Sequence, residues 1–235
     1  MALLKIVCAL GPRKLDGKTF SSTGAWSITK QYMAKAGCSN QTAGFSGVDC
    51  AYKLDVRLAN CLATFFHGLS VTELGSGVGR YKRQVDASGL ARAYTAYDGL
   101  SNVAELTHGM VAHADLTVDN PSLVQSDFAL SLEVAEHIPA RYEQTLMRNI
   151  DRSNRQGIVI SWSNMGGGQS AHGHVNPKRK SQVRMLFAPW GYVEDRNASA
   201  YLRTCATFLY LKRGIQVMRK QSSHGITVVS QGAQG

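Results

Sequence analysis

Three glycines recur at every second position in one short segment, and this spacing constrains the fold more than any other feature. The segment reads Val71-Thr-Glu-Leu-Gly-Ser-Gly-Val-Gly-Arg80, so an apolar stretch leads directly into Gly75, Gly77 and Gly79. Glycine permits sharp backbone turns and leaves no Cβ between the chain and a ligand. A strand that ends in such a turn and continues into a helix is a typical site for a nucleotide-like ligand.

The glycine spacing also distinguishes between two kinds of nucleotide site. A dinucleotide fingerprint is G-x-G-x-x-G, and its third glycine opens the helix that carries the pyrophosphate. Arg80 occupies that position here, because the third glycine comes one residue early. The acidic Glu73 stands two residues before Gly75. The pattern therefore argues against a nicotinamide-dependent oxidoreductase.

Strand and helix patterns alternate along most of the chain. Apolar residues fall on one helical face between residues 54 and 66, and short apolar runs follow at strand-like intervals. This alternation predicts an α/β fold with a doubly wound, mostly parallel sheet and helices on both faces. We expect strands at 69–74, 91–97, 109–116, 128–134 and 157–162, helices at 81–87, 138–150 and 177–187, two strands within 202–218, and a short helix at 26–36.

Composition sets the class of the protein and its expected surroundings. The 235 residues are 44% hydrophobic and 18% charged, as in a soluble globular protein. There is no apolar run near the ~20 residues that span a bilayer, and the N-terminus is a poor signal peptide. Five cysteines without C-x-x-C spacing argue against a zinc ribbon or a disulfide scaffold and for a reducing compartment. We expect a cytoplasmic protein with no membrane partner.

Three regions follow from these patterns. Residues 1–45, rich in Gly, Ser, Thr and Lys, form a loop-rich N-terminal extension; residues 46–222 form the α/β domain; and residues 223–235 form a C-terminal tail. The net charge of +10 makes RNA an alternative partner, but the basic residues are scattered along the chain, which favours an ordinary solvated surface. The sequence does not indicate an oligomeric state.

The E-x-G-x-G-x-G pattern resembles motif I of the class I S-adenosylmethionine (SAM) methyltransferases. The resemblance implies a seven-stranded sheet and SAM held by Glu73, Gly75, Gly77 and Gly79. It also implies that Asp115, after the third strand, receives the adenine amino group, although a solvated turn aspartate is an alternative.

The sequence itself suggests a further cofactor contact at Asp98. This residue ends the second strand 23 positions after Gly75 (98 − 75). An acid at about this distance binds the ribose hydroxyls in nucleotide-binding α/β sheets. The alternative is an Asp-Gly turn with no ligand.

Acidic and imidazole side chains follow the fourth strand, in Ser131-Leu-Glu-Val-Ala-Glu-His-Ile-Pro139. Ligands of open α/β sheets bind beyond the carboxyl ends of the strands, so Glu133, Glu136 and His137 are the candidate catalytic residues. The string resembles that of ubiquinone-type O-methyltransferases and of small-RNA 3′-terminal 2′-O-methyltransferases, in which carboxylates and histidines hold a divalent cation. His137 as a metal-free base and a purely structural role are the alternatives.

The loop after the fifth strand extends this set. His172, His174 and Asn176 alternate, so an extended segment would point all three the same way. The histidines could join Glu133, Glu136 and His137 in a site for Mg, Mn, Fe or Zn.

Several of these segments together resemble a group of uncharacterised methyltransferase-like proteins, over about residues 46 to 220. They include Tyr97-Asp-Gly99, Gly157-Ile-Val-Ile-Ser-Trp162 and His172-Gly-His-Val-Asn176. The resemblance implies SAM-dependent methyl transfer, with O-methylation of a small molecule or other hydroxyl-bearing acceptor as the leading hypothesis. A metal-assisted RNA 2′-O-methyltransferase and a non-catalytic SAM- or RNA-binding module are the alternatives.

Overall fold

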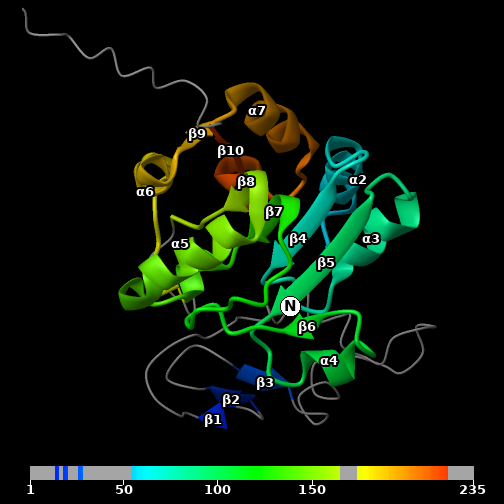
Figure 1. Ribbon diagram of the computed structural model, residues 1–235, viewed down its shortest axis with the longest axis vertical. Helices are drawn as coiled ribbons and strands as arrows, with labels where there is room; N and C mark the ends of the chain where they lie inside the picture. The colour runs from blue at the N-terminus through cyan, green and yellow to red at the C-terminus, as the bar shows by residue number, and fades with distance from the viewer. Residues whose placement is uncertain (1–13, 16–17, 21–25, 29–53, 165–173, 222–235) are drawn as a thin grey trace, which may run out of the picture.

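The computed structural model describes residues 14–15, 18–20, 26–28, 54–164 and 174–221, and they form two sheets (Figure 1). A small antiparallel sheet consists of β1 (Lys14–Leu15), β2 (Lys18–Phe20) and β3 (Trp26–Ile28). The short helix expected from Trp26 is therefore wrong over its first residues, where Trp26 pairs with Phe20 in strand geometry. Residues 29–36 of that prediction lie outside the described residues.

The main sheet has seven strands in the order β6-β5-β4-β7-β8-β10-β9. Its parallel strands are β4 (Ser70–Leu74), β5 (Ala93–Asp98), β6 (Ala112–His113), β7 (Ser126–Leu132) and β8 (Asn154–Ser161). β10 (Gln216–Lys220) runs antiparallel to β8, and β9 (Tyr192–Glu194) antiparallel to β10. The expected doubly wound, mostly parallel sheet is thus confirmed.

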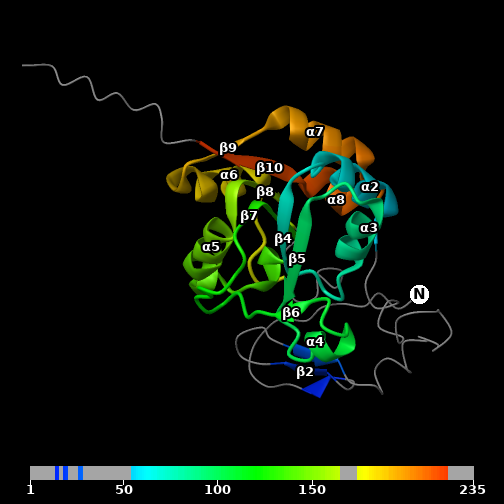
Figure 2. The same cartoon turned by 45° about the vertical axis from the view of Figure 1, so that its right-hand side comes forward.

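Helices cover both faces of this sheet (Figure 2). On one face a core that includes Leu58, Val85 and Leu202 lies beneath α2 (Val56–Phe65), α3 (Arg80–Ser88), α4 (Val103–Leu106), α7 (Arg196–Cys205) and α8 (Leu209–Gly214). On the other face a core that includes Leu146 and Phe187 lies beneath α5 (Glu143–Arg152) and α6 (Lys180–Phe187). Among the described residues, no helix combines the length and the apolar character needed to cross a membrane.

The strand order creates a switch point between β4 and β7. From β4 the chain builds β5 and β6 on one side and then returns to build β7 and β8 on the other. In open parallel sheets, this reversal opens a crevice at the carboxyl ends of the strands, where ligands bind. The glycine turn follows β4 and the E-x-x-E-H string follows β7, so both expected ligand segments lie at this edge.

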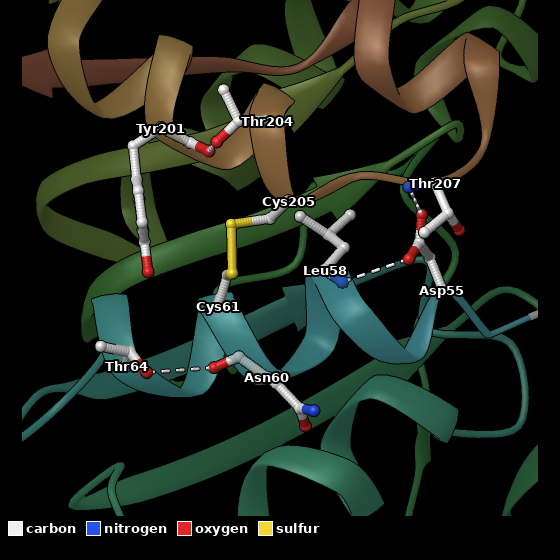
Figure 3. Close-up of a disulfide and its surroundings, with 9 residues drawn as sticks. All are labelled: Asp55, Leu58, Asn60, Cys61, Thr64, Tyr201, Thr204, Cys205 and Thr207. Atoms are coloured by element: carbon white, nitrogen blue, oxygen red, sulfur yellow. Dashed lines mark hydrogen bonds between the residues drawn. A yellow bond between two sulfur atoms is a disulfide. The ribbon is translucent and has the colours of Figure 1, made fainter.

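Two contacts join helix α2 to α7 and to the residues before α8 (Figure 3). Asp55 caps α2 by accepting a hydrogen bond from the Leu58 N–H, and its other oxygen accepts the N–H groups of Thr207 (2.6 Å) and Phe208 (3.0 Å). Cys61 and Cys205 form a disulfide although 144 residues separate them. This disulfide counts against the reducing compartment that the number and spacing of the cysteines suggested. Only the packing of α2 against α7 brings the two sulfurs together. The other three cysteines lie outside the described residues.

The end of the chain differs from expectation. Of the two strands expected within 202–218, the second is confirmed as β10, whereas the first is wrong, because α7 and α8 occupy that part of the chain. The apolar run Leu209-Tyr-Leu211 suits a short strand, yet it forms one turn of α8 in which Leu211 is buried while Leu209 and Tyr210 are exposed. The second antiparallel strand is β9, whose three residues are too few for a periodic pattern.

Candidate functional site

The turn after β4 requires glycine at each position of the motif. Gly75, Gly77 and Gly79 have φ values of 81°, 58° and 73°, in the left-handed region that side chains disfavour. A Cβ at Gly75 would collide with the Val134 side chain, and one at Gly79 would lie 2.7 Å from Met110 Cε. The motif therefore forms a tight backbone turn at the start of α3.

Asp98 links the end of β5 to this turn. Its Oδ2 accepts the Gly77 N–H at 2.6 Å and its Oδ1 accepts the Leu100 N–H at 2.9 Å. Burial raises the pKa of Asp98 to about 6, although the two amide hydrogen bonds act in the opposite direction. Each carboxylate oxygen keeps a second lone pair. Asp98 thus lies beside the glycine turn at the carboxyl edge, and its binding of ribose stays a prediction.

Glu73 is deeply buried on the face that α3 covers. The Tyr94 hydroxyl donates a hydrogen bond of 3.0 Å to its Oε2, and only 3% of the residue is exposed. Burial raises the pKa of Glu73 to about 8, and the Asp98 carboxylate raises it further. The hydrogen bond to Tyr94 gives Glu73 a structural role beneath the turn, while its contact with SAM stays a prediction.

Asp115 follows β6 at the same edge as Asp98. Its Oδ1 accepts hydrogen bonds from the Thr117 N–H at 2.9 Å and the Thr117 hydroxyl at 2.7 Å, which closes a local turn. Beside it, the Ala114 N–H donates to the Asp98 carbonyl at 2.9 Å. The structure thus holds Asp115 near the end of β5, and its contact with adenine stays a prediction.

Sequence reasoning missed Ser76 within the glycine turn. Its Oγ is buried and has no hydrogen-bond partner among the described residues. A buried hydroxyl normally finds a partner, so the Ser76 hydroxyl is available to a ligand bound at the turn. The motif is defined by its glycines, and nothing in the sequence indicates a role for Ser76 between them.

The backbone after β7 turns sharply at Glu133. This residue has a φ of 56°, which is uncommon for any residue other than glycine. Its N–H donates to both the carbonyl oxygen (3.2 Å) and the Oγ (2.9 Å) of Ser161 at the end of β8. Strained backbone of this kind persists only where its surroundings hold it, and it is common at functional sites.

Glu136, His137 and His174 come together beyond this turn. Their ligand atoms all lie within 4.8 Å of one another, and His174 Nε2 is 3.9 Å from Glu136 Oε1. The two imidazole rings meet edge to face with their centroids 4.8 Å apart. The structure therefore brings together three of the five expected metal ligands. Glu133 is not part of this tight group, and His172 lies outside the described residues.

The carboxylates at this site lack the partners that buried charges require. Both oxygens of Glu136 and Oε1 of Glu133 are buried with no hydrogen-bond partner among the described residues. Burial raises the pKa of Glu136 well above its ordinary value, and the nearby Glu133 carboxylate raises it further. Burial likewise raises the pKa of Glu133. Such groups are stabilised by a proton or by a bound cation.

A set of hydrogen bonds holds the segment after His174 against Glu136. The N–H groups of Val175 (2.8 Å) and Asn176 (2.9 Å) both donate to the Glu136 carbonyl. The Asn176 side chain donates to Glu143 Oε2 at 3.0 Å, and Lys178 Nζ lies 2.8 Å from the same oxygen. The Asn176 side chain therefore binds Glu143, whereas His174 faces Glu136. The expectation that His174 and Asn176 point the same way is wrong.

Neither a protein-family model nor a curated protein matches this chain. Solved structures do resemble it. Magnesium protoporphyrin IX methyltransferase from Synechocystis PCC 6803, with bound S-adenosylhomocysteine (SAH), has a TM-score of 0.53 at 13% identity, over 71% of this chain and 83% of that one. The methyltransferase domain of a bacterial CtHen1 has a TM-score of 0.52 at 15% identity, over 72% and 98%. The chain has the class I methyltransferase fold.

A third structure extends the same likeness. The pyocyanin biosynthetic protein PhzM has a TM-score of 0.51 at 15% identity, over 73% of this chain and 56% of that one. Identities this low show the fold alone. The chemistry of this protein therefore depends on the residues at its own carboxyl edge.

Proposed function

We propose that this protein is a SAM-dependent methyltransferase that methylates a hydroxyl oxygen with the help of a divalent cation. The observation that carries the proposal is the group of unpartnered carboxylate oxygens of Glu133 and Glu136 beside two imidazoles. This group lies at the carboxyl edge of the strand next to the glycine turn. A methyl acceptor of SAM would have to lie at the same place.

The cofactor side rests on the turn after β4. Gly75, Gly77 and Gly79 let the backbone approach the ligand, and Ser76 offers an unused hydroxyl. Asp98 and Asp115 stand at the ends of the next two strands, where ribose and adenine would lie. The SAH bound to the Synechocystis methyltransferase supports this choice of cofactor.

The two halves of the site touch each other. Val134 lies between Glu133 and Glu136 in the chain, and its side chain fills the space above Gly75. A methyl donor on the turn would therefore lie close to an acceptor held by the acidic cluster. Positioning of this kind is the main requirement for in-line methyl transfer.

Glu136, His137 and His174 would hold the cation, with Glu133 beside them. Carboxylate and imidazole donors suit Mg, Mn, Fe or Zn, and such an ion lowers the pKa of a hydroxyl group. SAM would supply the methyl group: the acceptor oxygen would bond to the methyl carbon as the bond from that carbon to the sulfonium sulfur broke, and the electron pair of that bond would stay on sulfur, giving SAH. Glu133, whose pKa is raised by burial, takes the hydroxyl proton.

The alternative functions have weaker support. Of the basic residues behind the net charge of +10, Lys178 pairs with Glu143, Lys220 with Asp151 and Arg219 with Asp195. These pairs reduce the charge available to phosphates, so the geometry favours a small hydroxyl-bearing acceptor over RNA. A non-catalytic module would not require the strained backbone of Glu133 or the buried Oε1 of its side chain, which has no hydrogen-bond partner among the described residues.

The experiment compares two histidine variants of the full chain. His137→Ala removes a proposed ligand, and His67→Ala, an exposed histidine after α2, serves as the matched control. We expect calorimetry to show Mn²⁺ binding in wild type and His67→Ala and its loss in His137→Ala, with SAH affinity equal in all three. Mn²⁺ binding that His137→Ala leaves intact would contradict the assigned cation site. Wild-type protein that fails to bind SAH would contradict the methyltransferase assignment itself.

A further inference from the structure

Basic side chains surround one carboxylate where α6, β9 and α7 meet at one end of the sheet (Figures 1 and 2). Glu194, the last residue of β9, accepts a hydrogen bond from Arg184 of α6 at 3.0 Å and one from Arg203 of α7 at 2.9 Å. Burial acts to raise the pKa of Glu194, but hydrogen bonds from Ser199 and the two arginines lower it. Glu194 is therefore ionised and holds both guanidinium groups in place.

Lys180, the first residue of α6, adds a third cation to this cluster. Burial lowers its pKa, the charge of Arg203 lowers it further, and the attraction of Glu194 offsets only part of this effect. Among the described residues, no carboxylate lies within ion-pair distance of its Nζ. In contrast, Lys178 and Lys220 lie 2.8 Å and 2.7 Å from a carboxylate oxygen. The fold thus brings the Lys180 ammonium close to other cations without an acid of its own.

The cluster has an excess of positive charge. Three cations share the single carboxylate of Glu194, which leaves two positive charges unbalanced. The next acid along the chain does not compensate them, because Asp195 caps α7 through the Ala198 N–H (2.9 Å) and pairs with Arg219 (2.8 Å). Cations that repel one another in this way are stabilised by a bound anion.

Two contacts with the backbone place the cluster at the carboxyl edge of the sheet. Arg203 Nε donates to the Ile215 carbonyl at 2.6 Å, and the side chain of the buried Gln216 donates to the Lys180 carbonyl at 3.3 Å. Gln216 pairs with Ile160, near the end of β8. The cluster therefore shares this edge with the acidic group that follows β7, but it is a separate site, beyond β8 and β10 in the strand order.

The two arginines have donors to offer a ligand. A guanidinium group carries five N–H donors. Arg184 binds Glu194 through Nη1, while Arg203 binds Ile215 through Nε and Glu194 through Nη2. Their side chains are 44% and 25% exposed, so a ligand can reach them from solvent. Because Glu194 already holds both groups, they lose little conformational entropy when an anion binds.

We propose that Lys180, Arg184 and Arg203 bind a phosphate group, which is either free phosphate or the terminal phosphate of a small molecule. Such a group carries about two negative charges near neutral pH, which matches the excess charge of the cluster. Its oxygens accept paired hydrogen bonds from arginine, and lysine adds a point charge. The site requires neither SAM nor a metal ion, so the inference goes beyond the proposed function.

The test is a titration of inorganic phosphate into the full chain at constant ionic strength, followed by ³¹P NMR line broadening. We expect saturable binding in wild type and binding at least about 5-fold weaker in Lys180→Ala, because a charge-assisted contact is lost. Lys220→Ala is the matched control. Lys220 stands at the other end of β10, where it pairs with Asp151, so this variant should bind phosphate as wild type does. Far-UV circular dichroism checks that both variants are folded.

Two esters identify the kind of phosphate. Methyl phosphate that binds as tightly as inorganic phosphate would assign the terminal phosphate of a small molecule, and much weaker binding would assign free phosphate. Dimethyl phosphate carries one negative charge, as each phosphate of a nucleic-acid backbone does, and should bind more weakly than inorganic phosphate. Equal affinity for these two would overturn the inference. So would equal phosphate affinity in Lys180→Ala and wild type, or the absence of saturable binding in wild type.

Discussion

Two carboxylates at opposite ends of the β7 region have opposite environments. Asp127, at the amino end, accepts hydrogen bonds from the Ser70 N–H (2.8 Å) and Ser70 Oγ (2.8 Å), and it pairs with Arg92 (2.6 Å) and Arg155 (3.0 Å). Glu136, just beyond the carboxyl end, has no hydrogen-bond partner for either oxygen among the described residues. Burial acts to raise the pKa of both. At Asp127 the hydrogen bonds outweigh burial and lower the pKa to about 2, whereas Glu136 remains well above its ordinary value.

The difference indicates which edge of the sheet serves stability and which serves binding. At the amino edge, Asp127 joins β4, β8 and the residue before β5 through its partners, so both of its oxygens contribute to the fold. At the carboxyl edge, the Glu136 carboxyl group is buried although neither oxygen accepts a hydrogen bond from the described residues. Perturbed carboxylates of this second kind gather at functional sites. We therefore expect a substitution at the carboxyl end of β7 to affect binding, and one at the amino end to affect stability.

Glu136→Gln should have the largest effect of the variants proposed here. It should lower the activity without lowering the stability of the metal-free protein. We expect turnover to fall by at least about 100-fold, since a ligand to the cation is lost. Without metal, however, the variant should melt at or above the wild-type temperature at pH 8. The raised pKa of Glu136 means that ionisation destabilises the folded chain as pH rises above the ordinary range of a glutamate. Thermal unfolding with and without Mn²⁺ measures this, and a metal-free variant that melts well below wild type would contradict the comparison.

Asp127→Asn should reduce stability and leave the site intact. A fall in pKa from 3.8 to about 2 corresponds to about 2 kcal/mol of stability at pH 7. Because the folded pKa is the lower one, this contribution is present above about pH 4 and disappears as the pH falls toward 2. Urea unfolding at pH 7 and pH 3 should show a difference between wild type and variant that shrinks at the lower pH. SAH affinity should not change. An equal difference in unfolding free energy between wild type and variant at pH 7 and at pH 3 would mean that the Asp127 ion pairs are not the source of that difference.

Sequence reasoning succeeded where the signal is local and failed where it depends on distant partners. Glu133, Glu136 and His137 stand within five residues after an apolar run, so their place at the carboxyl edge follows from the strand alone. Asp127 binds Ser70 from 57 residues away, and Asp55 binds Thr207 from 152 residues away. Only the packed sheet brings such pairs together. Helix α8 was missed because its apolar run, Leu209-Tyr-Leu211, suits a short strand equally well.

The two ends of α3 give the last prediction. Gly77, just before the helix, and Gly89, just after it, both have left-handed backbones, with φ of 58° and 65°. Valine is strained at either position, so Gly77→Val and Gly89→Val should lose similar amounts of stability. Only Gly77 lies at the carboxyl edge, where its N–H donates to Asp98. We expect Gly77→Val to weaken SAM binding by at least ~10-fold, or about 1.4 kcal/mol, while both variants remain folded.

Gly89→Val is the control for backbone strain alone. No atom lies within 4 Å of a Cβ at Gly89, and the residue stands at the far end of α3 from the turn, so SAM should bind this variant as tightly as it binds wild type. Calorimetric titration of the two variants at matched unfolding free energy separates lost binding from lost stability. Equal SAM affinity in Gly77→Val and wild type would remove the glycine turn from the cofactor site. Equal losses of SAM affinity in Gly77→Val and Gly89→Val would mean that backbone strain at the ends of α3 weakens binding, and not a lost contact at the carboxyl edge.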